Sequence, residues 1–426
     1  MGKEKMNRIT KNIQVAKTFL QGRVPGQLVI QYTDLCNAQC PQCGMRASND
    51  FPRTTLGVER TKEIIATAAE KGFAALSFTG GEPFLHLDEV CALSCYADQQ
   101  GIDYIRTGTN GYLFAGSDKA GFSDKVKRLA DKLAATPIRN IWVSIDSSDP
   151  QVHEQMRGLP GVIRGIEKAL PLFAERGIYL SANLGINRNF AGRQEREELD
   201  ADFFRAGFDR FYRYVADLGF SIANVCYPMW SEPEQADTEA VYAATTSDQI
   251  TYFSHVEKLA LFSALFETIP QHRQRLRIFT PRASLHALLN QYRGEEHLSS
   301  SCRGGIDFFF VDSADGNTYP CGYRGEENLG PFEQLEMKSC AGGDDCRRCD
   351  WECFRDPSEL FAPMTALRTT PLKLLQRLRQ DPEFIRLWWE DLRYYRACHY
   401  FNGRMAPSSS KLRDWELQGA PVAAIS

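Results

Sequence analysis

The most constraining feature of this 426-residue chain is a regular alternation of strand-like and helix-like segments between residues 27 and 227. Six short runs are rich in β-branched, aromatic and aliphatic residues, which is typical of strands. They cover residues 28–32, 74–78, 104–106, 141–145, 178–182 and 221–225. Segments with helical spacing follow each of the first five, at residues 59–71, 87–99, 124–133, 162–175 and 199–218. The pattern predicts a parallel sheet covered by helices.

Six strand–helix units are too few to close the usual eight-stranded barrel, so we expect an α/β fold built on a partial (β/α)6 barrel. In parallel α/β folds the active site lies at the carboxyl ends of the strands. Motifs rich in Cys, Gly and acidic residues directly follow several of the predicted strands. The sequence therefore places the chemistry at one edge of the sheet.

The rest of the chain departs from this alternation and suggests further units. We expect residues 1–25 to form a charged, helical lead-in, residues 26–230 the barrel core and residues 231–300 a helical bridge. Residues 301–360 are rich in Cys, Gly and Asp, which predicts a small module held together by metal. Residues 361–426 predict a helical, aromatic C-terminal extension.

Composition excludes several classes of protein. The formal net charge of −4 argues against binding to nucleic acid. No apolar run reaches the roughly 18 residues that a membrane span needs. The N-terminal segment is charged throughout and lacks the apolar core of a secretion signal. We therefore expect a cytoplasmic protein with no membrane span.

Thirteen cysteines fall into two groups and four isolated positions. Because disulfides are disfavoured in a reducing compartment, clustered cysteines there indicate metal ligands or catalytic thiols. Cys36, Cys40 and Cys43 lie within eight residues, directly after the first predicted strand. Three thiolates can wrap one face of an iron–sulfur cubane and leave one iron open, as catalytic metal sites require. A zinc site would need a fourth Cys or His nearby, and the next one is His86.

Further motifs follow the ends of successive predicted strands. They are residues 79–83 (TGGEP), 109–111 (TNG), 143–146 (VSID), 149–157 (DPQVHEQMR) and Asn187. Together with the Cys-x3-Cys-x2-Cys spacing, these segments resemble in order the motifs of the radical S-adenosylmethionine superfamily. The chemistry agrees, because glycines let a backbone approach a ligand closely and a carboxylate suits an ammonium group.

The resemblance implies that Cys36, Cys40 and Cys43 hold a catalytic 4Fe–4S cluster and that the other segments bind S-adenosylmethionine. The implied cofactor-binding residues are Gly80, Gly81, Glu82, Pro83, Asn110, Ser144, Asp146, Arg157 and Asn187. In the superfamily the GGEP segment holds the methionine amino group of the cofactor. An aromatic residue commonly precedes the third cysteine and touches the adenine. This chain has Gln42 there, so that contact is not carried over.

The second cysteine group resembles the SPASM or twitch extension of the same superfamily, which carries auxiliary 4Fe–4S clusters. Its implied ligands are Cys302, Cys321, Cys340, Cys346, Cys349 and Cys353. The usual spacing order is x2, x5, x3, whereas here it is x5, x2, x3. Two clusters, one of them with an open or non-cysteine ligand, a single cluster, and a structural zinc on the last four cysteines all stay open.

The isolated cysteines can be interpreted as packing residues. Cys398 is either a seventh ligand or a core residue of an aromatic helix. Cys91 and Cys95 lie one helical turn apart and fit packing positions. Cys226 ends the sixth predicted strand, which favours a core position.

The resemblance implies an enzyme that cleaves S-adenosylmethionine reductively and abstracts a hydrogen atom from an unactivated C–H bond. Auxiliary clusters would assist electron transfer or hold the substrate. The implied partners are a flavodoxin- or ferredoxin-type electron donor and a substrate that is either a peptide or a small metabolite or lipid. The competing hypothesis is an iron–sulfur or zinc protein for electron transfer or interaction. That hypothesis does not account for the TGGEP and VSID segments. No residue is singled out as a catalytic acid or base.

Overall fold

A computed structural model describes residues 18–44, 53–195, 198–230, 240–242, 245–246, 248–337 and 346–415. The strands are β1 Gly26–Thr33, β2 Phe73–Gly80, β3 Tyr104–Thr109, β4 Asn140–Ser144, β5 Ser181–Gly185, β6 Ile222–Cys226, β7 Arg277–Ile278, β8 Phe308–Val311 and β9 Thr318–Tyr319. The α-helices are α3 Val58–Glu70, α4 Leu87–Gln100, α5 Phe122–Ala134, α6 Pro150–Arg157, α7 Val162–Ala174, α8 Ala201–Leu218, α9 His255–His272, α10 Arg282–Tyr292, α11 Glu352–Thr369, α12 Pro371–Gln380, α13 Pro382–Ala397 and α14 Ser409–Arg413.

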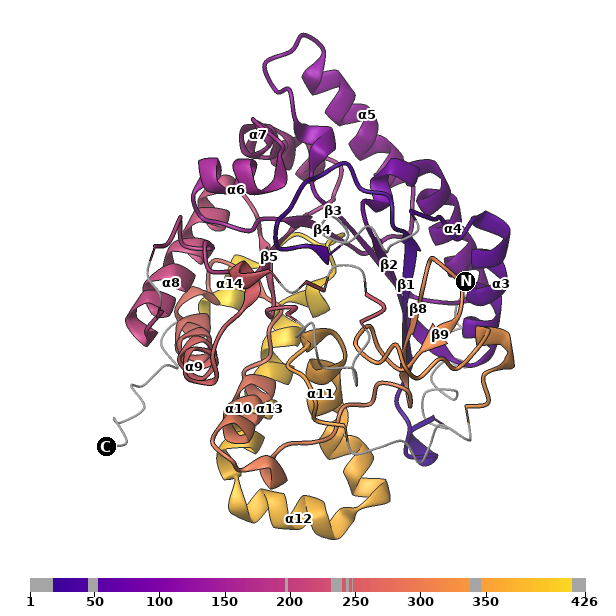
Figure 1. Ribbon diagram of the computed structural model, residues 1–426, viewed down its shortest axis with the longest axis vertical. Coiled ribbons are helices and arrows are strands. Elements are labelled where there is room, and N and C mark those ends of the chain that lie inside the picture. The colour runs from indigo at the N-terminus through magenta and orange to yellow at the C-terminus, as the bar shows by residue number, and fades with distance from the viewer. Residues whose placement is uncertain are drawn as a thin grey trace.

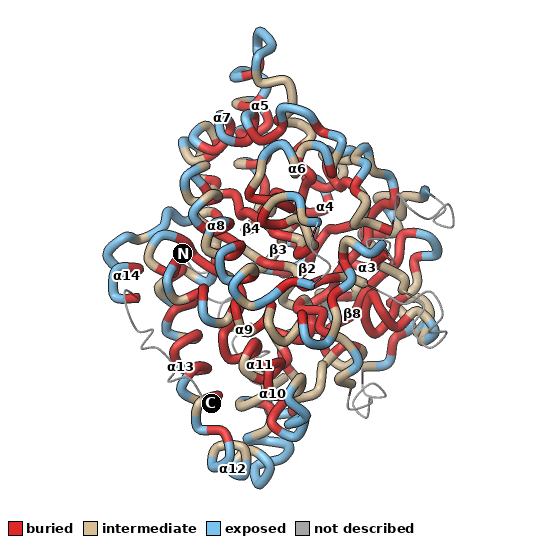
Figure 2. Tube along the Cα trace, turned by 60° about the vertical axis from the view of Figure 1, so that its left-hand side comes forward, coloured by how far each residue is buried: buried red, intermediate tan, exposed pale blue. Residues whose placement is uncertain are grey.

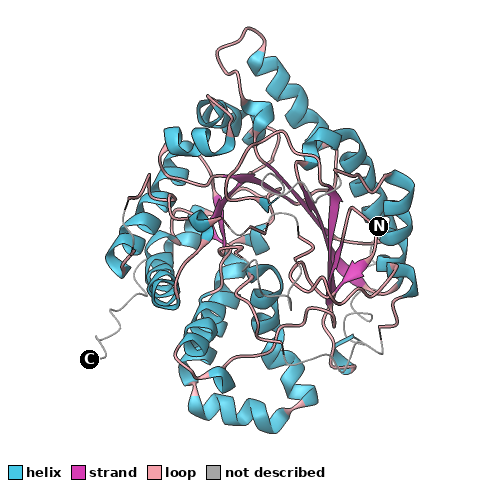
Figure 3. Ribbon diagram, in the orientation of Figure 1, coloured by secondary structure: helices cyan, strands magenta, loops and turns pink. Residues whose placement is uncertain are grey.

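The strands form one curved sheet in the order β7-β6-β5-β4-β3-β2-β1-β8-β9. All neighbours are parallel except β8 and β9. The six predicted strands are present in chain order, and the α/β partial barrel is confirmed. The structure adds β7 beside β6 and the β8–β9 hairpin beside β1. Figures 1 and 3 show the strands as an arc with helices outside it and α11 on its inner side.

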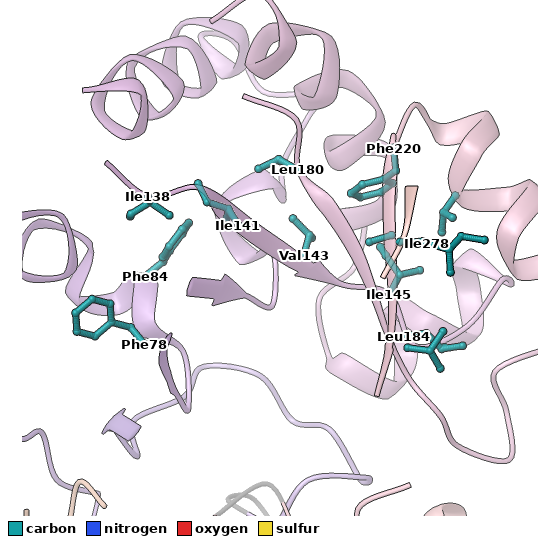
Figure 4. Close-up of a cluster of buried hydrophobic side chains, with 14 of the residues drawn as sticks. Phe78, Phe84, Ile138, Ile141, Val143, Ile145, Leu180, Leu184, Phe220 and Ile278 are labelled. Carbon is teal, nitrogen blue, oxygen red and sulfur yellow. The ribbon is translucent and has the colours of Figure 1, made fainter. Parts of the chain in front are cut away.

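Alternation along the strands separates two faces of the sheet. Every second residue, such as Leu28 and Ile30 of β1 or Leu76 and Phe78 of β2, is fully buried against the outer helices. Figure 4 shows part of this core, with side chains from β2, β4, β5 and β7. Burying one such side chain contributes roughly 1.5–3 kcal/mol, so this face stabilises the barrel.

One strand and one helix differ from the prediction. The fifth strand was expected at residues 178–182, whereas β5 spans Ser181–Gly185. The N–H of Tyr179 donates to the carbonyl of Gly403 in the C-terminal tail, so the ladder with β4 begins only at Ser181. The short helix α6 was not predicted. Asp149 caps it, and Pro150 stands in its first turn, a regular helix start.

The C-terminal helices close the open side of the arc. Helix α10 packs against α9, α11 and α13, and the first turn of α11 reaches the inner side of the sheet. Helix α12 has no buried residue and forms the exposed lower end of the molecule in Figure 2. None of the helices in the described ranges is long and apolar enough to cross a bilayer.

Candidate functional site

A cavity of about 320 Å³ lies on the inner side of the curved sheet. Each of the first six strands contributes to its wall, and the loops after β1 and β2 and the start of α11 complete it. Examples of these wall residues, one from each strand in chain order, are Val29, Thr79, Gly108, Ser144, Gly185 and Cys226. The carboxyl ends of the strands therefore meet at one site, as the topology predicts.

The strands present several polar side chains to this cavity, unlike the packed interior of a closed barrel. The inward positions carry Gln27, Ser77, Arg106, Asn183 and Asn224, which alternate with the apolar outward positions. This period-two alternation is present in the sequence and is the signal that identifies these inward-facing residues. A lumen lined by hydrogen-bonding groups is suited to a ligand and poorly suited to a dry core.

Cys36, Cys40 and Cys43 all line the cavity, and none of the three forms a disulfide. Burial raises the pKa of Cys40 to about 12. The N–H of Ala38 and the side-chain amide of Asn110 both approach Cys36 Sγ, at 3.5 and 3.8 Å. In the described part of the chain, no three His, Cys, Asp or Glu side chains converge on one metal ion. A cubane spreads three thiolates over separate irons, so thiolates that bind a cubane need not converge on a single ion.

The TGGEP turn lies directly beneath the cysteine loop. A Cβ on Gly80 would stand 2.1 Å from the carbonyl oxygen of Thr33, and one on Gly81 would stand 2.1 Å from that of Leu35. Gly80 also has φ 134°, a conformation that favours glycine. The N–H groups of Gly81 and Glu82 donate to Thr33 and Leu35 at 2.7 and 2.8 Å. The two glycines thus let the backbone of the TGGEP turn hydrogen-bond directly to the backbone that precedes Cys36.

Glu82 is fully buried at the cavity wall. Its carboxylate accepts the N–H groups of Asn110 at 2.6 Å and Phe84 at 3.0 Å. Burial nevertheless raises the pKa of Glu82 to about 7. Among the described residues no cation forms an ion pair with it. A carboxylate held in this way is suited to a ligand ammonium, which would favour its charged form.

A second charged group faces the same cavity at the end of β4. Arg157 makes a bidentate pair with Asp146, with Nε and Nη2 at 2.7 and 2.9 Å from the two carboxylate oxygens. Gln42 Nε2 donates to Asp146 at 2.6 Å, while Gln42 Oε1 is buried without a partner among the described residues. The residue that replaces the usual aromatic therefore extends this polar network and leaves an acceptor for a ligand.

Most of the predicted cofactor residues meet at this cavity, and one stands behind it. Gly80, Gly81, Glu82, Pro83, Asn110, Ser144, Asp146 and Arg157 line the wall. Asn187 is fully buried outside the lining. Its amide donates to the carbonyls of Asp146 and Gly185 at 2.9 and 2.8 Å. Asn187 thus holds the backbone ends of β4 and β5 together.

Four cysteines of the second group lie close together. The N–H of Cys302 donates to the carbonyl of Cys346, and burial together with the neighbouring thiols Cys349 and Cys302 raises the pKa of Cys321. Backbone N–H groups of Gly304 and Tyr323 approach Cys302 and Cys321 at 3.4 Å. Donors of this kind stabilise cluster thiolates. Cys340 lies outside the described residues.

Three further cysteines occupy two different surroundings. Cys353 lines the barrel cavity and accepts hydrogen bonds from Gln27 at 3.4 Å and Arg106 at 3.7 Å. Cys226 also lines the cavity and donates to Asn183 at 3.3 Å. It therefore faces the cavity and does not lie in the apolar core that its strand position favours. Cys398 is fully buried in an aromatic cluster with Tyr394, Phe401 and Trp415. That cluster is separate from the one containing Cys302, Cys321 and Cys349.

A buried hydrogen-bond network joins the first cysteine loop to the β8–β9 hairpin. Gln31 Nε2 donates to both Asp34 and Asp312 at 2.9 Å. Ser313 Oγ donates to Asp34 as well. Asp34 stands two residues before Cys36. The hairpin that leads to Cys321 therefore also positions the loop of the first three cysteines.

His153 should make the folded state sensitive to acid. Its Nδ1 accepts the N–H of Asp146 at 3.0 Å, and burial lowers the pKa of His153 to about 4. The unfolded chain therefore binds more protons than the folded one between about pH 6.5 and 4. As the pH is lowered through that window, the free energy of unfolding decreases by up to about 3 kcal/mol. Denaturant unfolding at a series of pH values should show this slope reduced in His153→Asn. The exposed His297→Asn should keep it, and equal slopes in both variants would contradict the assignment.

Comparisons with known proteins concern the family and the fold of the chain. A family model described as the Radical SAM superfamily matches residues 30–188. The AdoMet-dependent heme synthase of Methanosarcina barkeri is 22% identical over 316 residues, 73% of this chain and 82% of the relative. The GTP 3′,8-cyclase of Vibrio parahaemolyticus is 32% identical over 155 residues, 35% of this chain and 43% of the relative.

Solved structures are similar in fold at low sequence identity. Streptococcus suis SuiB bound to S-adenosylmethionine aligns with a TM-score of 0.50 and 17% identity. The alignment covers 74% of this chain and 65% of SuiB. At this level of identity the likeness concerns the fold alone.

Proposed function

Because this chain carries a radical SAM superfamily domain over residues 30–188, we propose that it cleaves S-adenosylmethionine reductively and abstracts a hydrogen atom from its substrate. The match confirms the superfamily and the enzyme class that the motifs predict, with a 4Fe–4S cluster and S-adenosylmethionine as the cofactors of that superfamily. When bound, these groups supply a 5′-deoxyadenosyl radical. The protein's part is to hold them, orient the substrate and exclude water.

One observation carries the proposal: three thiols, a buried carboxylate and an arginine–carboxylate pair line a single cavity. Cys36, Cys40 and Cys43 would hold the catalytic cluster. Glu82 would bind the cofactor's ammonium group, and Gly80 and Gly81 let the turn that carries it pack against the backbone of the cysteine loop. Arg157 and Asp146, with Ser144 beside them, would bind the cofactor's carboxylate and ribose.

For the second cysteine group, we propose one auxiliary 4Fe–4S cluster on Cys302, Cys321, Cys346 and Cys349. Their mutual proximity and the backbone donors at two of the sulfurs support this. Cys340 and Cys353 remain candidates for a further cluster. Cys398 is left out of the set, because its surroundings are aromatic and belong to a different part of the core.

The reaction needs an external one-electron donor of the flavodoxin or ferredoxin type, which would reduce the catalytic cluster. We propose a small molecule as the substrate in preference to a peptide. The enclosing wall formed by the sheet and α11 supports this choice. The heme synthases, whose name indicates a small-molecule product, align with most of the chain and also support a small-molecule substrate.

The test is anaerobic reconstitution with iron and sulfide, followed by dithionite and S-adenosylmethionine. We expect 5′-deoxyadenosine and methionine in equal amounts, with a slow background rate before a substrate is supplied. Chromatography of the quenched reaction measures both products. A preparation that carries its full complement of iron yet forms neither product would refute the proposal.

A further inference from the structure

Arg106 places a cation deep in the barrel cavity. It comes from the inner face of β3 and lines the wall beside Trp142 and Cys353. Its Nε donates to Ser77 Oγ at 2.5 Å, and its Nη2 approaches Cys353 Sγ at 3.7 Å. The neighbour Ser77 holds the guanidinium at one nitrogen. The edge formed by Nη1 and Nη2 keeps most of its donors for another group.

No carboxylate in the described part of the chain forms an ion pair with this half-buried guanidinium, whereas the partly buried Arg157 and the fully buried Arg273 both have such partners. Arg157 pairs with Asp146, and Arg273 pairs with Glu390 and Asp391. The acidic side chain near Arg106 is Glu352, whose Oε2 accepts the N–H of Tyr227 at 3.0 Å. Glu352 is near enough to interact electrostatically with Arg106, but no carboxylate among the described residues contacts the guanidinium directly. A cation held in a cavity without a direct anionic partner is costly. The site is therefore built for an anion that arrives with a ligand.

The position of Arg106 separates this anion site from the cofactor site. Along β3, Arg106 precedes Asn110 by four residues, which is about 13 Å of extended chain. Asn110 lies at the other end, where it approaches Cys36. A molecule anchored at Arg106 would therefore extend along the cavity toward the cysteine loop.

Aromatic side chains line the space between these two ends. Trp142 lies over Gly108, where a Cβ would stand 1.9 Å from the indole nitrogen. Tyr242 and Trp351 line the wall with ring centroids 6.0 Å apart, and Tyr242 donates to or accepts from Thr79 Oγ1 at 3.1 Å. Such rings offer flat apolar faces to a ligand.

We propose that Arg106 anchors an oxyanion, a carboxylate or a phosphate ester, on a substrate with a planar apolar body. This inference rests on the proposed function, since it identifies the substrate class of the same cavity. The Nη1–Nη2 edge binds the two oxygens of the anion, and the body lies against Trp142, Tyr242 and Trp351. The anion fixes which carbon of the substrate reaches the cofactor end.

Binding of three matched probes to the reconstituted enzyme with S-adenosylmethionine tests the proposal. They are 2-naphthoate, 2-naphthamide and 2-naphthyl phosphate, measured by isothermal titration calorimetry. We expect at least one anion to bind about tenfold or more tightly than the amide. The better anion identifies the group that the site prefers. Equal affinities for all three probes, or no binding of either anion, would overturn the proposal.

Substitutions at Arg106 connect that preference to the side chain. Arg106→Met should reduce the anion's advantage over the amide to less than about twofold, while Arg106→Lys should keep part of it. The surface variant Arg164→Gln should match the wild type. Thermal melting checks that each variant is folded. If Arg106→Met does not fold, Arg106→Lys still tests whether the anion preference depends on this side chain. An unchanged preference in folded Arg106→Met would overturn the proposal. Failure of wild-type cofactor cleavage, in contrast, would count against the proposed function alone.

Discussion

Replacing Cys36 by alanine should abolish cleavage of S-adenosylmethionine, with a loss of at least about 1000-fold, or roughly 4 kcal/mol in the barrier. Cys36 lies at the cavity wall, where Ala38 and Asn110 place donors near its sulfur. Removing this thiolate leaves two protein ligands for a cluster that needs three. The variant should also lose about four iron atoms per chain after reconstitution, the content of one 4Fe–4S cluster.

Cys95→Ala is the matched control, because Cys95 is a free, half-buried thiol on α4. It should retain both the iron content and the cleavage rate of the wild type. Iron analysis with Mössbauer spectroscopy separates the lost cluster from the auxiliary one, which should persist in Cys36→Ala. If Cys36→Ala keeps all its iron and its rate, these three cysteines do not hold the catalytic cluster.

Gly81→Ala should be strongly damaging although it adds only one methyl group. Its new Cβ would stand 2.1 Å from the backbone oxygen of Leu35, one residue before Cys36. Because the obstacle is backbone, the cysteine loop must move, and a displacement of this kind costs about 100-fold in rate. We also expect about 1–3 kcal/mol of lost stability from the overpacking. Cleavage assays and denaturant unfolding measure the two effects.

Gly185→Ala supplies the comparison within the same cavity. Its Cβ would meet only Asp146 Oδ1, at the ordinary contact distance of 3.5 Å. We expect a loss of rate under about tenfold and little change in the free energy of unfolding. Equal damage from both substitutions would show that close backbone contact is not what Gly81 provides.

Local patterns were sufficient for much of the fold and for the cofactor end of the site. Strand composition and helical spacing located all six core strands, with β5 displaced by three residues. Cys36, Cys40 and Cys43 lie within one short loop, and the parallel topology brings Glu82 and Asp146 to the same edge. The displacement of β5 has a long-range cause, the bond from Tyr179 to Gly403, which strand composition cannot report.

The sequence by itself determined the six-strand core, the three-cysteine loop and the residues that follow each strand, because these depend on spacing within a few residues and on the direction of parallel strands. Tertiary structure alone decided that β8 joins β1, that Asn187 supports β4 and β5 from behind, and that Cys398 stands apart from the other cysteines. It also brought Cys353 to Arg106 across 247 residues of chain. Such contacts arise from the packing of whole elements, so no local pattern records them.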